Sequence, residues 1–144
     1  FDSMDSFVLL AVPLYVLAGR LMMTGGVARR LVDFAVALIG FLRGGLAAST
    51  VLTSMLFATI SGSSAATAAA IGSTLIPEME RKKYPRPFAA AVVASSGELG
   101  VIIPPSVPMV IYAVITGVSI TDLFLAGVLP GILIGLSLIV TIVV

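Results

Sequence analysis

The 144-residue chain contains no cysteine, no histidine and no tryptophan, and it is poor in charge. Without cysteine the chain has no disulfide or thiolate chemistry, and without histidine it lacks the commonest general base and metal ligand of proteins. Charged residues make up 10% of the chain and hydrophobic residues 59%, with a mean hydropathy of +1.20. A soluble domain carries roughly 25% charged residues. So few charges cannot cover a water-facing surface, and we expect much of the chain to face lipid.

The net charge of +1 comes from short clusters between apolar runs, a pattern that indicates membrane topology rather than nucleic-acid binding. Three runs contain no Asp, Glu, Lys or Arg: Gly44–Pro77, Leu99–Thr121 and Leu123–Val144. Each is at least as long as the roughly 20 residues that cross a bilayer core. We therefore predict an all-α, multi-pass membrane protein. Because the chain starts at Phe1 and stops inside an apolar run, we expect it to be part of a longer subunit.

The order of apolar and charged segments predicts four units. The first begins with a span from about residue 6 to 23, followed by a helix over 27–42 whose charged ends fit either an interfacial helix or a short span. The four units are a transmembrane helix with an interfacial helix over residues 1–43, a re-entrant hairpin over 44–80, a discontinuous transmembrane helix over 81–121 and a final transmembrane helix over 122–144.

The hairpin is predicted from two short legs, Leu46–Ile60 and Ala65–Ile76, that meet at Ser61-Gly62-Ser63-Ser64. The second leg would be roughly 18 Å long, well short of a hydrocarbon core of about 30 Å. Arginine and lysine residues flank both ends of the run, so both ends are expected on the cytoplasmic side. Two legs that start and finish on one side place the tip near the middle of the membrane. The small residues of the second leg favour close packing among other helices.

A second irregular segment is predicted at Pro104-Pro105-Ser106-Val107-Pro108, because three prolines within five residues cannot continue the helix over 88–116. Ser106 followed by Pro108 is a helix-start signal. Irregular backbone at membrane depth is tolerated where it is buried in protein or lines a watery cavity, and secondary transporters build their sites in this way. We therefore interpret the tip and the break as parts of one site. Unwound carbonyls could ligate Na⁺, and the two helix N-termini could hold an anion.

Glu98 is the one acidic residue inside an otherwise apolar span, shortly before the proline break. Burying a carboxylate in a membrane is costly, so Glu98 is a functional candidate. It could bind a cation, carry a proton or pair with a basic residue outside this chain; a structural ion pair or an interfacial position is the alternative. By contrast, we expect Ser49, Thr53 and Ser54 to donate to their own helix, the usual role of a hydroxyl in a membrane helix.

Two stretches resemble the large membrane subunit of tripartite ATP-independent periplasmic (TRAP) transporters. The first is Gly62–Ser73, reading GSSAATAAAIGS, followed by Leu75–Met79; the second is Gly100–Tyr112, reading GVIIPPSVPMVIY. The resemblance implies a subunit of the bacterial inner membrane with an inverted-repeat, elevator-type fold that takes up an organic anion, often a dicarboxylate, together with Na⁺. It also implies two partners, a periplasmic substrate-binding protein and a small four-helix membrane subunit.

The same resemblance implies which residues form the site. Na⁺ would be bound through Ser61, Gly62, Ser63, Gly97 and Gly100. The other ion- or substrate-binding residues would be Ser64, Glu98, Pro104, Pro105 and Ser106. Glu98 departs from the family pattern, in which many members carry a small or hydroxyl residue near this position. The family's second hairpin and second broken helix are not in this chain, so the other half of the substrate site and the second Na⁺ site are not predicted.

Other classes fit the sequence less well. An intramembrane serine protease would need a base for its serine, and an aspartyl protease would need two aspartates at mid-membrane depth; the chain has no histidine and no such pair. A scaffold subunit without a transport site would not need two aligned helix breaks. A divalent-anion/Na⁺ symporter that works without a binding protein remains the alternative.

Overall fold

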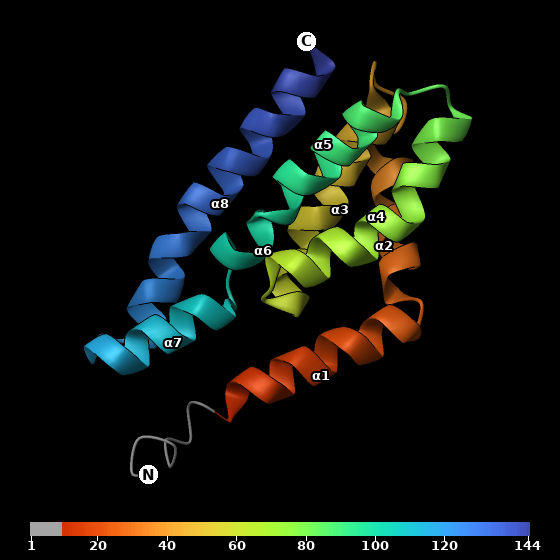
Figure 1. Ribbon diagram of the computed structural model, residues 1–144. Coiled ribbons are helices and arrows are strands. Elements are labelled where there is room, and N and C mark those ends of the chain that lie inside the picture. The colour runs from red at the N-terminus through yellow and green to blue at the C-terminus, as the bar shows by residue number, and fades with distance from the viewer. Residues whose placement is uncertain (1–9) are drawn as a thin grey trace.

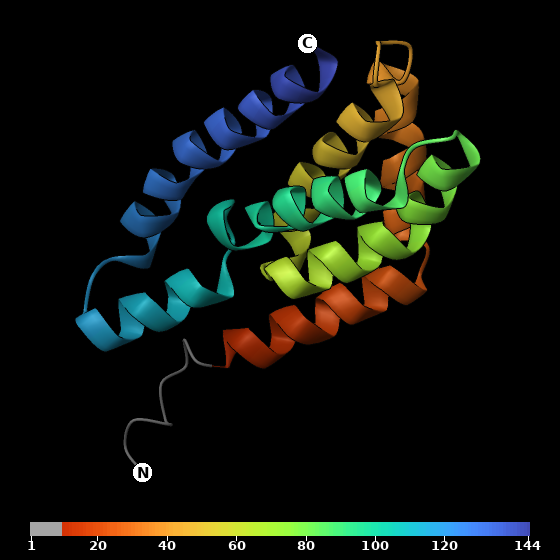
Figure 2. The same ribbon diagram turned by 45° about the horizontal axis from the view of Figure 1, so that its top comes forward.

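The computed structural model describes residues 10–144, which form eight helices and no strand. The helices are α1 (Ala11–Thr24), α2 (Val27–Ile39), α3 (Gly45–Ser61), α4 (Ser64–Arg81), α5 (Arg86–Gly97), α6 (Leu99–Ile102), α7 (Val107–Thr116) and α8 (Ile120–Val143). The predicted all-helical class is confirmed. In Figures 1 and 2, α3 and α4 form a hairpin whose joint lies between α1 and the broken α5–α6–α7 segment.

Helix α3 is the centre of the packing, since it contacts α1, α2, α4, α5, α6 and α8. Of its 17 residues 11 are buried, so protein covers most of its surface. Most of these buried residues are glycine, alanine, serine or threonine; the larger exceptions are Val51 and Phe57. Small side chains let neighbouring backbones approach closely, which is how helices associate in a membrane.

The second leg of the hairpin is longer than predicted. The predicted end at Ile76, just before Pro77, is wrong, because α4 continues to Arg81. Its 18 residues span about 27 Å. Packing explains the difference: Met79 is fully buried, and its sulfur lies 3.7 Å from the Thr50 hydroxyl of α3. The last turn of α4 is otherwise exposed and charged, so only the earlier part of the leg has the character of a buried membrane segment.

Residues Arg86–Thr116 form one apolar stretch of 31 residues that is divided into α5, α6 and α7. The chain leaves helical geometry at residues 103–106, where the prolines predict a break. A further interruption at Glu98, between α5 and α6, was not predicted. This stretch and α8 are the two in the described part of the chain that are long and apolar enough to cross a membrane, and α3 is a shorter apolar helix.

Helices α1 and α2 precede the hairpin. Helix α1 has 14 residues, about 21 Å, and is shorter than the predicted span, whose first residues lie outside the described part of the chain. Helix α2 buries one face, formed by Ala28, Val32 and Ala35, while Arg29 and Asp33 are exposed. The buried face packs against α3 and α4. One-sided burial of this kind fits both positions predicted for the helix, at the interface or as a short span.

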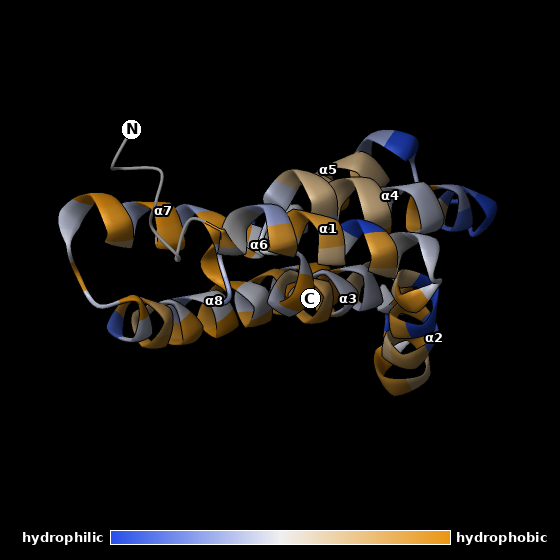
Figure 3. Ribbon diagram, turned by 90° about the horizontal axis from the view of Figure 1, so that it is seen from below, coloured by the Kyte–Doolittle hydropathy of each residue, from blue (hydrophilic) through white to orange (hydrophobic). Residues whose placement is uncertain are grey.

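Helix α8 presents a row of buried glycines to the bundle: Gly127, Gly131 and Gly135. They lie four residues apart and therefore share one face. A β-carbon at Gly127 would lie 2.7 Å from the Ile102 carbonyl oxygen, and one at Gly131 would lie 2.6 Å from the Ile103 side chain. Helix α8 can approach α6 only because these side chains are absent. Figure 3 shows α7 and α8 as mostly hydrophobic apart from a hydrophilic segment at one end of α8; other hydrophilic segments lie near the α4–α5 connection and on α2.

We expect Gly127→Leu to destabilise the protein by about 1–3 kcal/mol, because leucine would collide with a backbone carbonyl that cannot rotate away. Ala126→Leu is the matched control, since Ala126 is exposed on the same helix. The measurement is the midpoint of thermal unfolding of the purified protein in detergent. Equal midpoints for the two variants would contradict the close packing of α8 on α6.

Candidate functional site

The tip of the hairpin is a turn between two helix ends. Helix α3 ends at Ser61, and Gly62 follows with a φ of 60°, a left-handed conformation that glycine adopts without steric cost. The Gly62 N–H donates to the Ala58 carbonyl at 3.2 Å and closes the last turn of α3. Ser63 then caps α4, because its hydroxyl accepts from the Ala66 N–H at 3.4 Å. One helix therefore ends and the next begins within two residues.

A buried hydroxyl cluster lies behind the tip. Ser61 Oγ and Thr67 Oγ1 are 2.7 Å apart, and the two residues are 2% and 0% exposed. The Thr67 hydroxyl donates to the Ser63 carbonyl at 2.9 Å, and the Thr67 N–H donates to the same carbonyl at 3.0 Å. Both lone pairs of that carbonyl are thus used inside the hairpin. Thr67 was not among the predicted site residues; its position four residues after Ser63 on the same helix was the available signal.

The break between α6 and α7 is held by Ser106. Ile103 leaves helical geometry with a ψ of 125°, and the two prolines follow. Ser106 is fully buried; its hydroxyl donates to the Val101 carbonyl at 2.7 Å and accepts from the Met109 N–H at 3.4 Å. It therefore caps α7, as the Ser-Pro spacing predicts, and also satisfies a carbonyl at the end of α6. One side chain bridges the two halves of the broken helix.

The hairpin tip and the helix break meet directly. The Val107 N–H, the first of α7, donates to the Gly62 carbonyl at 3.1 Å. A β-carbon at Gly62 would lie 2.9 Å from the Pro105 carbonyl oxygen, and one at Gly100 would lie 2.7 Å from the Ser63 carbonyl oxygen. This approach therefore needs glycine at both positions. The two segments predicted to be irregular form a single junction in the fold.

Most of the predicted site residues belong to this junction. The segments that meet contain Ser61, Gly62, Ser63, Ser64, Gly100, Pro104, Pro105 and Ser106. Gly97 is the last residue of α5 and lies outside the junction; a β-carbon there would come within 2.9 Å of the Ala68 side chain. The oxygens that the junction offers are carbonyls and hydroxyls, and residues 10–144 contain no group of three or more His, Cys, Asp or Glu that could hold a metal. Oxygen ligands suit hard cations; the role of these residues in binding Na⁺ stays a prediction.

Glu98 lies between α5 and α6 but outside this cluster. Its side chain is exposed, whereas Gly97 and Gly100 are buried against α4. Within residues 10–144 no basic side chain lies within 4.0 Å of Glu98, so this part of the chain does not form the ion pair considered for it. The structure thus separates Glu98 from the other predicted site residues. Its cation or proton role stays a prediction.

The remaining buried hydroxyls of α3 have packing roles, and one differs from the expectation. Ser49 and Thr53 each donate to a carbonyl one turn earlier at 2.7 Å, as expected. Ser54 instead bonds the Ser96 hydroxyl of α5 at 3.0 Å, and both residues are buried. This bond ties the broken helix to the first leg of the hairpin.

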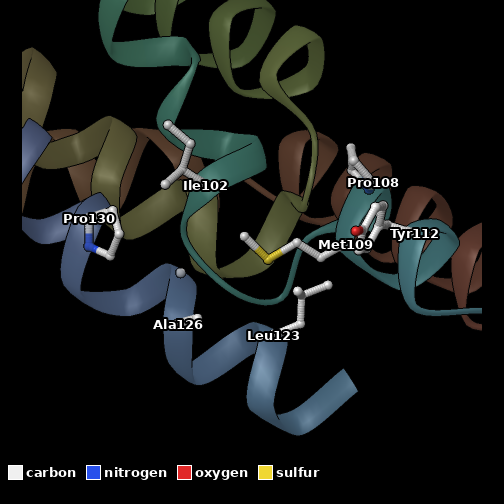
Figure 4. Close-up of a pocket in the computed structure, with 8 residues that line it drawn as sticks. Ile102, Pro108, Met109, Tyr112, Leu123, Ala126 and Pro130 are labelled. Carbon is white, nitrogen blue, oxygen red and sulfur yellow. The ribbon is translucent and has the colours of Figure 1, made fainter. Parts of the chain in front are cut away.

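Two cavities border the junction and differ in polarity. One, of about 510 Å³, lies between α7 and α8 and is lined mostly by apolar side chains. Figure 4 shows Met109 extending from α7 across this space toward α8. The other, of about 460 Å³, lies between α1 and the hairpin tip, and its polar lining residues are Arg20, Thr24, Ser61 and Ser63. A charged solute therefore fits the second cavity better than the first.

An apolar, all-helical chain in which a hairpin tip meets a broken helix has an architecture typical of membrane transport proteins. A sequence model of the family described as "Tripartite ATP-independent periplasmic transporter, DctM component" matches residues 1–144. The chain belongs to this family, which confirms the family predicted from the sequence. It is accordingly part of an integral membrane protein.

Individual relatives are similar to the chain over nearly its whole length. It is 54% identical over 142 residues to the C4-dicarboxylate TRAP transporter large permease protein DctM of Pseudomonas aeruginosa, covering 99% of this chain and 33% of that protein. It is 49% identical over 138 residues to the isethionate TRAP transporter permease protein DctMQ of Oleidesulfovibrio alaskensis, covering 96% and 22%. It is 45% identical over 140 residues to the 2,3-diketo-L-gulonate TRAP transporter large permease protein YiaN of Escherichia coli, covering 97% and 33%. The chain spans a third or less of the length of these relatives.

We expect Thr67→Val to destabilise the hairpin by about 1–3 kcal/mol, because it removes the 2.7 Å partner of the buried Ser61 hydroxyl. Thr67→Ser is the matched control, since it keeps the hydroxyl and removes only a methyl group. The thermal unfolding midpoint of the purified permease in detergent distinguishes the two. Equal losses in both variants would contradict a stabilising role for the hydroxyl cluster.

Proposed function

We propose that the permease containing this chain carries out secondary active transport: the Na⁺-coupled uptake of an organic anion across the bacterial inner membrane. Membership of the family supports transport as the activity. The named relatives support an anionic cargo, since C4-dicarboxylates, isethionate and 2,3-diketo-L-gulonate are all organic anions. Isethionate is a sulfonate and the other two are carboxylates; a dicarboxylate or another carboxylate is the substrate class that we propose.

The observation that carries this proposal is the contact between the hairpin tip and the helix break, made by the Val107–Gly62 hydrogen bond. Three helix ends meet there. The C-terminal end of α3 presents carbonyls with partial negative charge, and the N-terminal ends of α4 and α7 present amides with partial positive charge. Secondary transporters use such opposed ends to hold a cation and an anion side by side.

The hydrogen bonds of the junction indicate how each residue would contribute to a cation site. The Gly62 carbonyl accepts one hydrogen bond, from Val107, and keeps a lone pair for Na⁺. The Ser63 carbonyl already accepts two hydrogen bonds from Thr67, so Ser63 would contribute its hydroxyl instead. Ser61 contributes a hydroxyl, and the predicted Gly97 and Gly100 have only backbone oxygens to offer.

We also propose that the permease receives its anion from a periplasmic substrate-binding protein and works with a small membrane subunit, because the family is described as tripartite. The hairpin and the broken helix are joined by the Val107–Gly62 and Ser54–Ser96 hydrogen bonds. We expect segments joined in this way to move as one body during transport, which fits an elevator-type mechanism.

The proposal predicts that the complete complex, reconstituted in proteoliposomes, accumulates radiolabelled succinate only under an inward Na⁺ gradient and only with its binding protein present. The measurement compares initial rates in Na⁺ and in choline, each with and without binding protein. Uptake that ignores Na⁺ contradicts the coupling. Uptake without binding protein favours the alternative, a divalent-anion/Na⁺ symporter that works alone.

We expect Ser63→Leu to abolish uptake without loss of membrane insertion, because leucine removes the α4 cap and places bulk beside the helix break. Ser73→Leu is the matched control, since Ser73 is exposed on the same helix. Uptake rates are compared at equal amounts of inserted protein. Retained uptake in Ser63→Leu would show that the hairpin tip is not part of the transport site.

A further inference from the structure

The cavity between α1 and the hairpin tip joins two parts of the chain that are far apart in the sequence. Helix α1 contributes Gly19, Arg20 and Thr24, and the tip contributes Ser61 and Ser63. Its volume of about 460 Å³ lies within the roughly 300–1,000 Å³ of sites for small molecules. The cavity therefore has room for a small organic acid beside the junction described above.

Arg20 is the only charged residue among residues 10–144 that lines this cavity. Among residues 10–144 the one ion pair within 4.0 Å is that of Arg86 with Glu80, so no carboxylate of this part of the chain neutralises Arg20. A guanidinium group on an apolar membrane helix is costly unless it finds a counter-charge or faces a watery space. Its planar fork of donors matches a carboxylate or sulfonate.

Another cavity with basic side chains has no net positive charge. The cavity between α2 and α4 is lined by Arg29 and Arg81 but also by Asp33 and Glu78, so its charges cancel. In the described part of the chain, no charged residue lines the apolar cavity between α7 and α8. Of these three cavities, the one that contains Arg20 is the one whose described lining residues carry a net positive charge.

The backbone places Arg20 close to the hairpin tip. A β-carbon on its neighbour Gly19 would lie 3.7 Å from the Ser61 α-carbon, so α1 passes the tip at van der Waals contact. Ser61 and Ser63 line the cavity and are also proposed Na⁺ ligands. An anion held by Arg20 would thus lie next to the cation, and each charge would favour binding of the other.

We propose that Arg20 binds the acid group of the transported anion in the cavity between α1 and the hairpin tip. This rests on the proposed function, since it takes the anion to be the cargo of the permease. Arg20 acts as a specificity residue for acids, and α1 becomes one wall of the substrate site.

The first test measures the charge of the cavity without transport. Ala69→Cys places a thiol on an exposed residue that lines the cavity, in a permease whose other cysteines are replaced by serine. We expect an anionic methanethiosulfonate reagent to modify it faster than a cationic one, and Arg20→Gln to lower this rate ratio several-fold. Ala90→Cys is the control, since Ala90 is exposed on α5. A ratio that Arg20→Gln leaves unchanged would overturn the proposal.

The second test measures succinate uptake by the complete complex in proteoliposomes. We expect Arg20→Gln to lower the initial rate about tenfold or more, because a hydrogen-bonded charge pair is lost. The rate of Arg20→Lys should lie between those of the wild type and Arg20→Gln. Arg30→Gln is the matched control, since Arg30 is an exposed arginine on α2. Wild-type uptake together with an active Arg20→Gln variant overturns the role of Arg20. No uptake by the wild type instead counts against the proposed function, and the thiol rates still decide whether the cavity attracts anions.

Discussion

The hydrogen bond from the Val107 N–H to the Gly62 carbonyl joins the hairpin tip and the proline break, two places where this chain leaves helical geometry among apolar segments. Each place exposes backbone groups that a continuous helix would satisfy, and such a group left unpaired in a bilayer costs several kcal/mol. The hairpin tip supplies a carbonyl and the broken helix supplies an amide, so each irregular segment satisfies the other. Ser106 completes this arrangement by bonding the Val101 carbonyl and the Met109 amide on either side of the break.

For the hairpin tip and the broken helix to form this hydrogen bond, their backbones must approach closely, and close approach requires small residues. Gly100 lies against the Ser63 carbonyl and Gly97 against Ala68, at distances that leave no room for a β-carbon. The same closeness brings the Ser61 and Thr67 hydroxyls within 2.7 Å of each other in a buried place. A cluster of carbonyl and hydroxyl oxygens at the meeting point of three helix ends follows from the packing. The polar character of the junction is thus a consequence of how the small-residue segments fit together.

The predictions from sequence succeeded where a residue type has one dominant local effect. Three prolines within five residues interrupt a helix, and Ser106 before Pro108 starts one, so the break was predicted where it occurs. They were wrong or incomplete where packing overrides local preference. Helix α4 runs past Pro77 because Met79 is buried behind it, and Ser54 bonds Ser96 rather than its own helix.

The sequence by itself determined the membrane class, the family, the positions of the hairpin tip and the proline break, and most residues of the junction. The family follows from the resemblance of two motif stretches, and the other properties follow from composition, from uncharged runs and from residues whose backbone constraints act locally. Only the tertiary structure decided that Gly62 bonds Val107, that Thr67 joins the buried hydroxyl cluster, that Glu98 is exposed, and that Arg20 of α1 lines the cavity beside the tip. The physical reason is that these relations depend on how distant helices pack, and no local pattern records which small residue will meet which neighbour.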